Sequence, residues 1–269
     1  WFYTGSMSVA RNQHTASVLS NGKVLVTGGW NGSNNALYSV ELYDLSTGIW
    51  AATGNMTNAR YFHTASVLPN GKVLVTGGGN DHGYLNSAEL YDPSIGIWAI
   101  TGNMTNARYG HIASVLLNGK VLVTGGYNGV ALNSAELYDQ STGIWTATGN
   151  MANARQWHTA SVLQNGKVLV TGGYYGISTV LNSAELYDPS TGIWTTTGSM
   201  TNVRYFHTAS VLSNGKVLVA GGVNGSISLN SAELYDPSTG IWTTASNMAN
   251  ARTSHTASVL PNGKVLVTG

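Results

Sequence analysis

The chain has 269 residues, of which 42% are hydrophobic and only 9% charged, and 12 Lys and Arg offset 11 Asp and Glu to leave a formal net charge of +1. This balance excludes a basic nucleic-acid-binding face, and it also excludes intrinsic disorder, which needs low hydrophobicity and high net charge. The absence of Cys excludes disulfides and thiolate chemistry, and no apolar run reaches the ~18 residues of a membrane-spanning helix, so we expect no membrane insertion.

The chain repeats itself with a period of 47–49 residues. The clearest marker is an Arg followed three residues later by a His, which occurs six times, and Trp, Glu and a Gly-Gly pair keep the same register. A period of this length is typical of repeat architectures. We predict one domain over 1–269, with units at about 8–54, 55–102, 103–149, 150–198 and 199–246, and with 1–7 and 247–269 sharing one further unit.

In chain order, each unit predicts four short strands. In the second unit, residues 63–68 and 72–76 are apolar runs that flank an Asn-Gly turn, the strongest short hairpin signal. Residues 87–92 then lead through Pro-Ser-Ile-Gly, a tight reversal, into residues 97–101. Four antiparallel strands in each period are the pattern of a propeller blade, and neighbouring sheets must stack because one sheet cannot bury both of its faces.

The two ends of the chain predict one shared blade. Residues 1–7 match a fourth strand, and residues 255–269 match a first and a second strand. Closure through the termini would give six blades, the sixth of which lacks its third strand. Three explanations stay open: the chain is a fragment of a longer protein, a neighbouring molecule supplies the strand, or the array holds more blades and this closure is wrong.

These motifs resemble kelch repeats. The resemblance rests on the Gly-Gly that ends the second strand, the Tyr of the third and the Trp of the fourth, which in the second unit are Gly77-Gly78, Tyr91 and Trp98. Arg-x-x-His before the first strand and Ala-Glu-Leu-Tyr-Asp-Pro in the third extend it to almost all 269 residues. The resemblance implies an all-β fold, a β-propeller of four-stranded blades, but no single function, because propellers host many.

One end of the sheets carries loops that vary between units, after the second strand and before the first. The other end carries nearly identical Asn-Gly and Asp-Pro-Ser-Thr-Gly turns, which are typical of scaffold. Variable loops are where repeat proteins usually bind, so we predict a ligand-binding face for a glycan or a protein; alternatively, half or more of its rings pack on the next blade's loops. The aromatic residues of this face are Trp30, Tyr61, Phe62, Tyr84, Tyr109, Tyr127, Trp157, Tyr174, Tyr175, Tyr205 and Phe206.

The aligned arginines have two interpretations. They could form a cationic ring that captures carboxylates, because a guanidinium offers a bidentate fork. We favour the alternative that each pairs with the Glu of a third strand, such as Glu89, since a carboxylate between packed sheets needs a partner. The aligned arginines are Arg11, Arg60, Arg108, Arg155, Arg204 and Arg252.

The aligned histidines could bind a metal ion, but groups related by the symmetry of a propeller tend to lie too far apart, so we expect hydrogen-bonded structural residues and no metal. His82, beside Asp81, is out of register and is a modest ligand candidate. The aligned residues are His14, His63, His111, His158, His207 and His255.

Catalysis is not expected. An enzyme normally breaks the symmetry of a repeat array, because its acid, base and nucleophile need different environments, whereas here nearly every ionisable group recurs in equivalent places. No metal-protease, nucleophile-elbow, phosphate-loop or calcium-loop motif is present. We therefore predict a protein that is not an enzyme and has no cofactor.

Two hypotheses for function remain. The first is a binding module, extracellular or secreted, that presents the aromatic face to a glycan or protein; four sequons are compatible with secretion. The second is a self-assembling structural protein of a filament or matrix, in which the open blade accepts a strand from a neighbouring copy. The sequence does not name the ligand. The sequons begin at Asn31, Asn55, Asn103 and Asn224.

Overall fold

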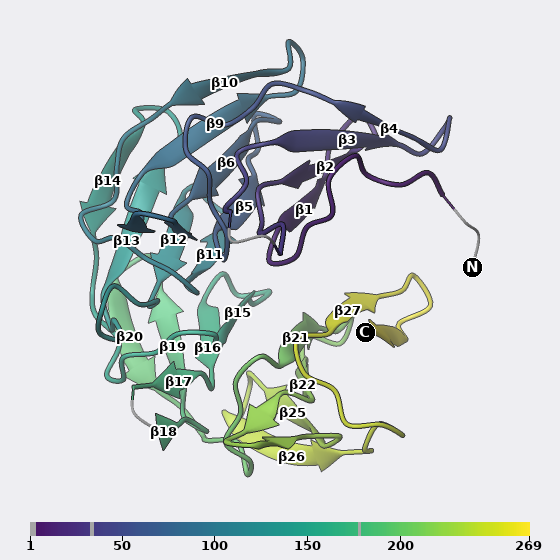
Figure 1. The fold of residues 1–269 in the computed structure, drawn as a ribbon. Helices are drawn as coiled ribbons and strands as arrows, with labels where there is room; N and C mark the ends of the chain where they lie inside the picture. The colour runs from purple at the N-terminus through teal and green to yellow at the C-terminus, as the bar shows by residue number, and fades with distance from the viewer. Residues whose placement is uncertain (1–3, 33–34, 177–178) are drawn as a thin grey trace. The chain divides into compact units, whose positions relative to one another are not determined.

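The computed structural model describes residues 4–32, 35–176 and 179–269, and every helical or strand element in this part of the chain is a β-strand (Figure 1). Within these ranges, no helix is long and apolar enough to cross a membrane. The chain divides into two compact units. The first holds the described residues up to Val123 together with Glu136–Ala147, and the second holds Thr124–Ala135 and Thr148–Gly269.

The first unit contains two complete four-stranded antiparallel sheets and most of a third. Strands lie in the orders β1-β2-β3-β4, β5-β6-β9-β10 and β11-β12-β13-β14, so each sheet follows the chain outward from its first strand. The bounds are β1 (Thr15–Val18), β2 (Val24–Thr27), β3 (Val40–Asp44), β4 (Ile49–Ala52), β5 (Thr64–Val67), β6 (Val73–Thr76), β9 (Ala88–Asp92), β10 (Ile97–Ile100), β11 (Ile112–Val115), β12 (Val121–Thr124), β13 (Ala135–Asp139) and β14 (Ile144–Ala147).

The second unit repeats the same plan in two further sheets, with the orders β15-β16-β19-β20 and β21-β22-β25-β26, and ends in the pair β27-β28. The bounds are β15 (Thr159–Val162), β16 (Val168–Thr171), β19 (Ala184–Asp188), β20 (Ile193–Thr196), β21 (Thr208–Val211), β22 (Val217–Ala220), β25 (Ala232–Asp236), β26 (Ile241–Ala245), β27 (Thr256–Val259) and β28 (Val265–Thr268).

The four strands predicted for each repeat are confirmed. In the second sheet, each observed strand is one residue shorter than predicted at one or both ends. The trimmed residues Leu68 and Lys72 close the Asn-Gly turn, where Leu68 N donates to the Lys72 carbonyl at 2.8 Å. The fold is therefore all-β and of the β-propeller type, as the sequence implied.

The two ends of the chain match the prediction in part. The first and second strands expected near the C-terminus are β27 and β28. Of the strand expected at 1–7, residues 1–3 lie outside the described residues and residues 4–7 form no strand. Gly5 nonetheless accepts a hydrogen bond from the Trp50 indole at 2.8 Å. The count of six blades and the unit boundaries stay predictions.

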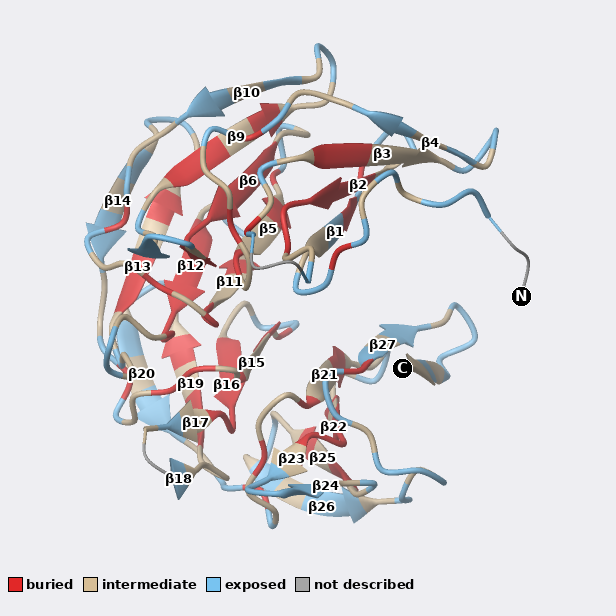
Figure 2. Cartoon of the chain, viewed as in Figure 1, coloured by how far each residue is buried: buried red, intermediate tan, exposed pale blue. Residues whose placement is uncertain are grey.

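Burial falls from the inner strands to the outer strand of each sheet (Figure 2). All four residues of β6 are buried, whereas three of the four in β10 are exposed. The second strand is sandwiched within its sheet and covered by neighbouring sheets, which explains its continuous Val-Leu-Val sequence. The fourth strand is the outer edge of its sheet, and its mixture of exposed and half-buried residues is typical of a strand with one face in solvent.

The hydrophobic core lies between successive sheets. In the first unit, Met56 and Tyr91 are buried among aliphatic residues of β2, β3 and β6. In the second unit, Met200 and Tyr235 occupy the same places among residues of β16, β19 and β22. Each sheet thus shares its apolar residues with the next, which is why a repeat is stable only beside its neighbours.

The Gly-Gly pair after the second strand permits a close approach between sheets. Gly77 has a φ of 59°, and a Cβ built on it would lie 2.5 Å from the Arg108 carbonyl oxygen and 2.7 Å from His111 Cε1. Gly78 N donates to the same carbonyl at 2.8 Å. A side chain at Gly77 would therefore separate the second sheet from the third.

Candidate functional site

Five of the six aligned arginines are buried and bonded to the Glu of a third strand, as predicted. Arg60 Nη2 lies 2.8 Å from Glu89 Oε1, and its Nη1 donates to the Gly77 carbonyl at 2.7 Å. These guanidiniums are enclosed, so they do not form a ligand-binding cationic ring. Arg252 donates to the carbonyl of Gly269. The pairs are Arg11–Glu41, Arg60–Glu89, Arg108–Glu136, Arg155–Glu185 and Arg204–Glu233.

The buried carboxylates have several donors each. Glu89 accepts from the backbone N–H groups of Thr57 at 2.6 Å and Asn58 at 3.1 Å, in addition to Arg60. Burial by itself would raise the pKa of Glu89, but these hydrogen bonds and the charge of Arg60 outweigh it and hold the pKa below its usual value. Glu89 is therefore ionised, and it ties the loop before the first strand to the third strand.

Five of the aligned histidines, from His63 to His255, bond to Thr hydroxyls of the preceding sheet. His111 Nε2 lies 3.0 Å from Thr64 Oγ1 and 3.1 Å from Thr76 Oγ1. Burial, reinforced by the charge of Arg108, lowers the pKa of His111 to about 3. Burial does the same for His207, with Arg204 as the next cause, and its pKa is also about 3. These imidazoles are neutral near pH 7 and hydrogen-bonded, as expected of structural residues.

No cluster of three or more His, Asp or Glu side chains that could hold a metal ion occurs in the described ranges. His82 is exposed, and its backbone N–H donates to Asn80 Oδ1 at 2.9 Å. Asp81 accepts from Ala36 N at 3.3 Å, so this carboxylate bridges two neighbouring loops.

The turns at the opposite end of the sheets are held by local hydrogen bonds. In the second sheet, Asp92 accepts from the Ser94 hydroxyl at 2.6 Å and pairs with Lys72 at 3.2 Å. The equivalent Asp139 has its pKa lowered to about 2, first by the Ser141 hydroxyl. The same arrangement recurs in every complete sheet, so these charges serve the turns.

The loops of the variable end are tied together in pairs. Tyr61, before β5, forms a β-bridge with Gly79, after β6, and Gln156 forms the equivalent bridge with Tyr174. The loop after the second strand extends in three repeats as a small hairpin. These hairpins are β7 (Gly79–Asn80) with β8 (Gly83–Tyr84), β17 (Tyr174–Tyr175) with β18 (Thr179–Val180), and β23 (Val223–Asn224) with β24 (Ile227–Ser228).

In the first unit, the predicted aromatic residues form one cluster. The rings of Trp30 and Tyr61 lie 4.9 Å apart, edge to face, and Tyr109 contacts Tyr61, Phe62 and Tyr84 at 5.7, 4.9 and 5.8 Å. Burial raises the pKa of Tyr109, and Tyr61 and Tyr84 add to the effect. We call these five residues the first aromatic cluster.

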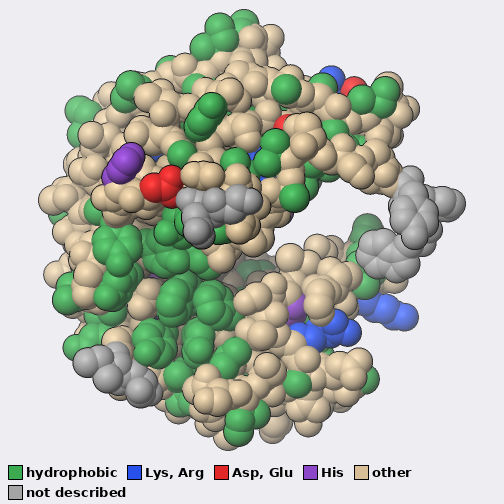
Figure 3. Space-filling model, in the orientation of Figure 1, with side chains coloured by type: hydrophobic (Ala, Val, Ile, Leu, Met, Phe, Trp, Pro, Cys, Tyr) green, Lys and Arg blue, Asp and Glu red, His purple; other side chains and the backbone are tan. Residues whose placement is uncertain are grey.

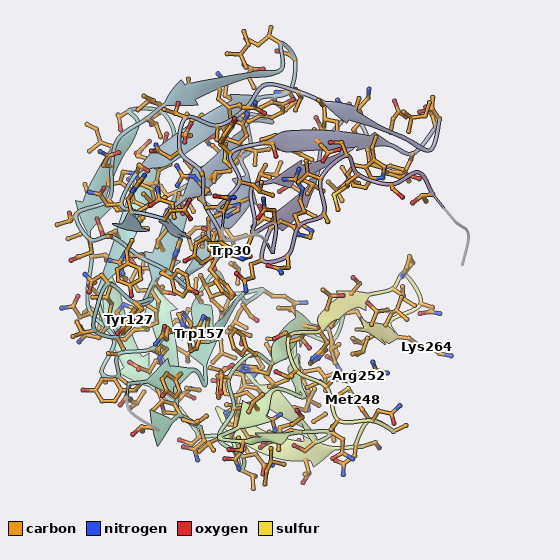
Figure 4. All side chains as sticks on the ribbon, viewed as in Figure 1. Trp30, Tyr127, Trp157, Met248, Arg252 and Lys264 are labelled. Atoms are coloured by element: carbon orange, nitrogen blue, oxygen red, sulfur yellow. The ribbon has the colours of Figure 1, made fainter. Side chains whose placement is uncertain are left out.

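In the second unit, Trp157 is the centre of a second aromatic cluster, formed with Tyr174, Tyr205 and Phe206. Its ring centroid lies 5.8, 6.0 and 4.9 Å from those of the three rings, and Tyr174 and Tyr205 are 5.5 Å apart. Figure 4 marks Trp30 in the first unit and Trp157 in the second. Figure 3 shows hydrophobic side chains gathered around β17, with no acidic or basic side chain among them.

The rings of the variable loops stay partly accessible. Tyr84 and Tyr175 are 44% and 51% exposed, and the other predicted aromatics are intermediate between buried and exposed. Tyr127 forms a backbone bridge to Ala131 in the second unit. The rings therefore pack on one another without becoming core residues.

The residue before each aligned His has a left-handed backbone. The φ values are 50° at Phe62, 52° at Trp157 and 52° at Phe206, and the third repeat has Gly110 at 61°. Bulky residues rarely adopt this conformation, and they persist in it where the surrounding structure enforces it, often at binding sites. Backbone bonds enforce it here, since Phe206 N donates to the Trp157 carbonyl at 3.2 Å.

One residue of the site was not predicted. Gln156 is only 4% exposed and lies next to Trp157, and Gln156 Oε1 and Trp157 Nε1 are both buried without a hydrogen-bond partner among the described residues. The available signal was a break within the middle repeats, because Tyr occupies this position at 61, 109 and 205, whereas the copies at the two ends have Asn12 and Thr253. A prediction based on aromatic rings does not include an amide.

Comparison with known proteins gives matches at the level of family. A family model described as the KLHDC2/KLHL20/DRC7 Kelch-repeats domain matches residues 2–173, which is more than half of the chain. A second, described as the Kelch motif, matches residues 158–201 and again residues 204–249. No curated protein gives a significant match.

Proposed function

The chain belongs to the kelch-repeat family, and on this premise we propose that it is a non-enzymatic protein-binding module that contacts its partner through the aromatic loops. Kelch-repeat domains generally mediate protein–protein interaction and are typically non-enzymatic. The use of the aromatic loops by this chain is our own inference.

The observation that carries the proposal is the connected cluster of rings in each unit. In the second unit, Trp157 contacts three other rings on two loops, and none of these side chains belongs to the buried core between sheets. Large, rigid, partly exposed rings are the side chains that contribute most to protein interfaces. The scaffold does not need them, because Gln13, Gly110 and Ser254 occupy the position that is Phe or Trp in the other three copies of the motif.

The ionisable groups support a binding function over a catalytic one. Arg60, Glu89 and His111 are each engaged in bonds that recur in the other repeats, and burial keeps His111 neutral near pH 7. A catalytic acid or base needs access to substrate and a pKa suited to its task. These groups have neither.

The proposed partner is a protein in preference to a glycan. Sugar-binding sites combine a stacking ring with several convergent polar groups that bond to hydroxyls. In the second aromatic cluster, the charged residues of the adjoining loops, Arg155 and Arg204, are fully buried and paired. The cluster itself presents partly accessible aromatic rings with no free charge beside them, which suits apolar side chains of a protein segment.

The test is selection of random twelve-residue peptides displayed on phage against the chain, followed by affinity measurement of synthetic peptides. Alanine at Trp157 or Tyr109 should weaken at least one selected peptide by tenfold or more, since central aromatic residues dominate interfaces. Ile193→Ala is the matched control, because Ile193 is 58% exposed but lies at the start of an outer strand.

Three results would contradict the proposal. Peptides that bind with equal affinity to all these variants would place the site elsewhere. If the chain binds an immobilised glycan panel and selects no peptide, its ligand is a glycan and not a protein. A chain that selects no peptide but sediments as large regular assemblies would support the structural hypothesis instead.

A further inference from the structure

Buried polar atoms without a partner fall into two groups in the described chain. Most are Arg Nε and His Nδ1 atoms that recur at equivalent positions, on side chains whose other nitrogens are bonded, as in Arg60 and His111. Three others occur once: Gln140 Oε1, Gln156 Oε1 and Trp157 Nε1. The atoms of the first group are unpartnered because of the geometry common to all repeats, whereas those of the second group are unpartnered at single positions.

Gln156 and Trp157 are the two that are adjacent in the sequence. They are consecutive residues, one offering an acceptor and the other a donor, and both lie in the second aromatic cluster or beside it. Gln140 lies at the opposite end of its sheet, in a turn where three other repeats have Pro and the first has Leu45. A buried polar atom without a partner is disfavoured, so two adjacent ones need a reason.

The local backbone holds this pair in place. Gln156 N donates to the Tyr174 carbonyl at 3.0 Å and Tyr174 N donates back to the Gln156 carbonyl at 2.8 Å. Trp157 is fixed in the left-handed region, at a φ of 52°, where an indole is unfavourable. The repeat tolerates other residues here, since the second and fifth repeats have Tyr61-Phe62 and Tyr205-Phe206 at the equivalent positions, and neither of these pairs has an orphaned polar atom.

The surroundings specify the chemistry of a ligand. The adjoining loops at 153–158, 173–181, 202–207 and 222–229 contain no Asp, Glu or Lys, and their Arg155 and Arg204 are buried and paired. A charged partner group would find no counter-charge there and would lose its hydration. An uncharged group with both a donor and an acceptor fits, and a primary carboxamide carries the two on one planar head.

We propose that Gln156 and Trp157 are the specificity-determining residues of the second aromatic cluster and recognise the side-chain amide of an Asn or Gln in an uncharged, apolar segment of the protein partner. The partner's NH₂ donates to Gln156 Oε1, and its carbonyl accepts from Trp157 Nε1. A backbone amide serves less well, because its N–H and C=O point in opposite directions.

Binding requires a small rearrangement. Both polar atoms are covered in the free chain, so a neighbouring ring must turn aside before the amide reaches them. Changes of side-chain rotamer are common at interfaces whose backbone stays fixed. Tyr175, on the adjoining hairpin, is the most exposed ring of these loops, at 51%.

This inference rests on the proposed function, and its test uses peptides selected from the same phage library on the unmodified chain. The key variant is the double substitution Gln156→Tyr with Trp157→Phe, which recreates the pair of the second and fifth repeats and so preserves folding and aromatic area. Gln164→Ser is the matched control, because Gln164 lies in the turn at the other end of the same repeat and Ser occupies that position at 20 and 213.

We expect the selected peptides to share an Asn or Gln beside apolar residues, and their affinity to fall about tenfold or more in the double variant and to be unchanged in the control. The indole N–H resonance of Trp157, identified by its loss in Trp157→Phe, should shift on addition of peptide. The indoles of Trp194 and Trp242 donate to glycine carbonyls at 2.8 Å and should not shift.

The outcomes separate the two proposals. If no peptide is selected at all, the proposed function fails and this inference falls with it. If peptides bind and depend on other aromatic residues, but the double variant binds them normally or the Trp157 indole does not shift, the inference alone is wrong. Selected peptides without Asn or Gln would also overturn it.

Discussion

The outer strands of the sheets and the loop end of the second unit place the same chemical group, a tryptophan indole, in different hydrogen-bonding surroundings. The Trp98 indole donates to the Gly54 carbonyl at 2.7 Å, and four other fourth-strand indoles have equivalent bonds at 2.8 Å. The Nε1 atom of the Trp157 indole is buried but has no acceptor in the described chain. The indoles that recur in each repeat have acceptors, because an unsatisfied buried donor would destabilise the fold. A donor without an acceptor at a position that occurs once suggests a role in binding.

The strongest way to test the interior is to break one buried ion pair. Arg60→Met would leave Glu89 buried with only its two backbone donors, and the loss of one partner of such a pair costs about 3–5 kcal/mol. We expect the free energy of unfolding, measured by urea titration, to fall by about that amount. The fall would confirm that the interior pairs hold the fold.

Two controls accompany this measurement. Lys72→Met removes the exposed partner of Asp92 and should leave the urea midpoint unchanged, because solvent screens that pair. Replacement of both Arg60 and Glu89 by Met should cost less than Arg60→Met alone, since no uncompensated charge remains. A cost below about 1 kcal/mol for Arg60→Met would contradict the scaffold interpretation.

The second prediction concerns the loss of folding stability at acidic pH. The pKa of His111 falls from the usual 6.5 to about 3 on folding, so below pH 6.5 the unfolded chain binds more protons than the folded one. The stability from His111 is therefore complete above pH 6.5 and is lost as the pH falls toward 3. At pH 5 the loss is about 2 kcal/mol.

The measurement is the free energy of unfolding at pH 7.5 and at pH 5, in the original chain and in His111→Gln. The variant should lose about 2 kcal/mol less between the two values. Glu89 and Glu136 contribute little in this range, because their pKa values are lowered from 4.5 and most of their stabilisation is lost at lower pH. An unchanged acid dependence would show that His111 is not held neutral by burial.

Much of the interior could be predicted from the sequence, and less of the loop end. The Asn-Gly turns fixed the number of strands, and the matching registers of Arg60 and Glu89 led to their pairing, because a carboxylate between packed sheets needs a cation. Gln156 was missed for a physical reason. The break in the repeat marks position 156 as unusual, but it does not say whether the amide is solvated or buried. That depends on how the neighbouring rings pack.

The smallest predicted effect compares the two kinds of indole directly. Trp98→Phe and Trp157→Phe delete the same atoms, but only the first breaks a hydrogen bond, so we expect Trp98→Phe to be the less stable variant by about 1 kcal/mol in urea unfolding. Trp145→Phe, which loses a bond of 2.8 Å to the Gly102 carbonyl, should repeat the result for Trp98. If Trp157→Phe proves as costly as these two, the Trp157 N–H has an acceptor in the free chain, and the ground for assigning it to a partner's amide is gone. If it costs less, the donor is idle in the folded chain and gains its bond only when something binds.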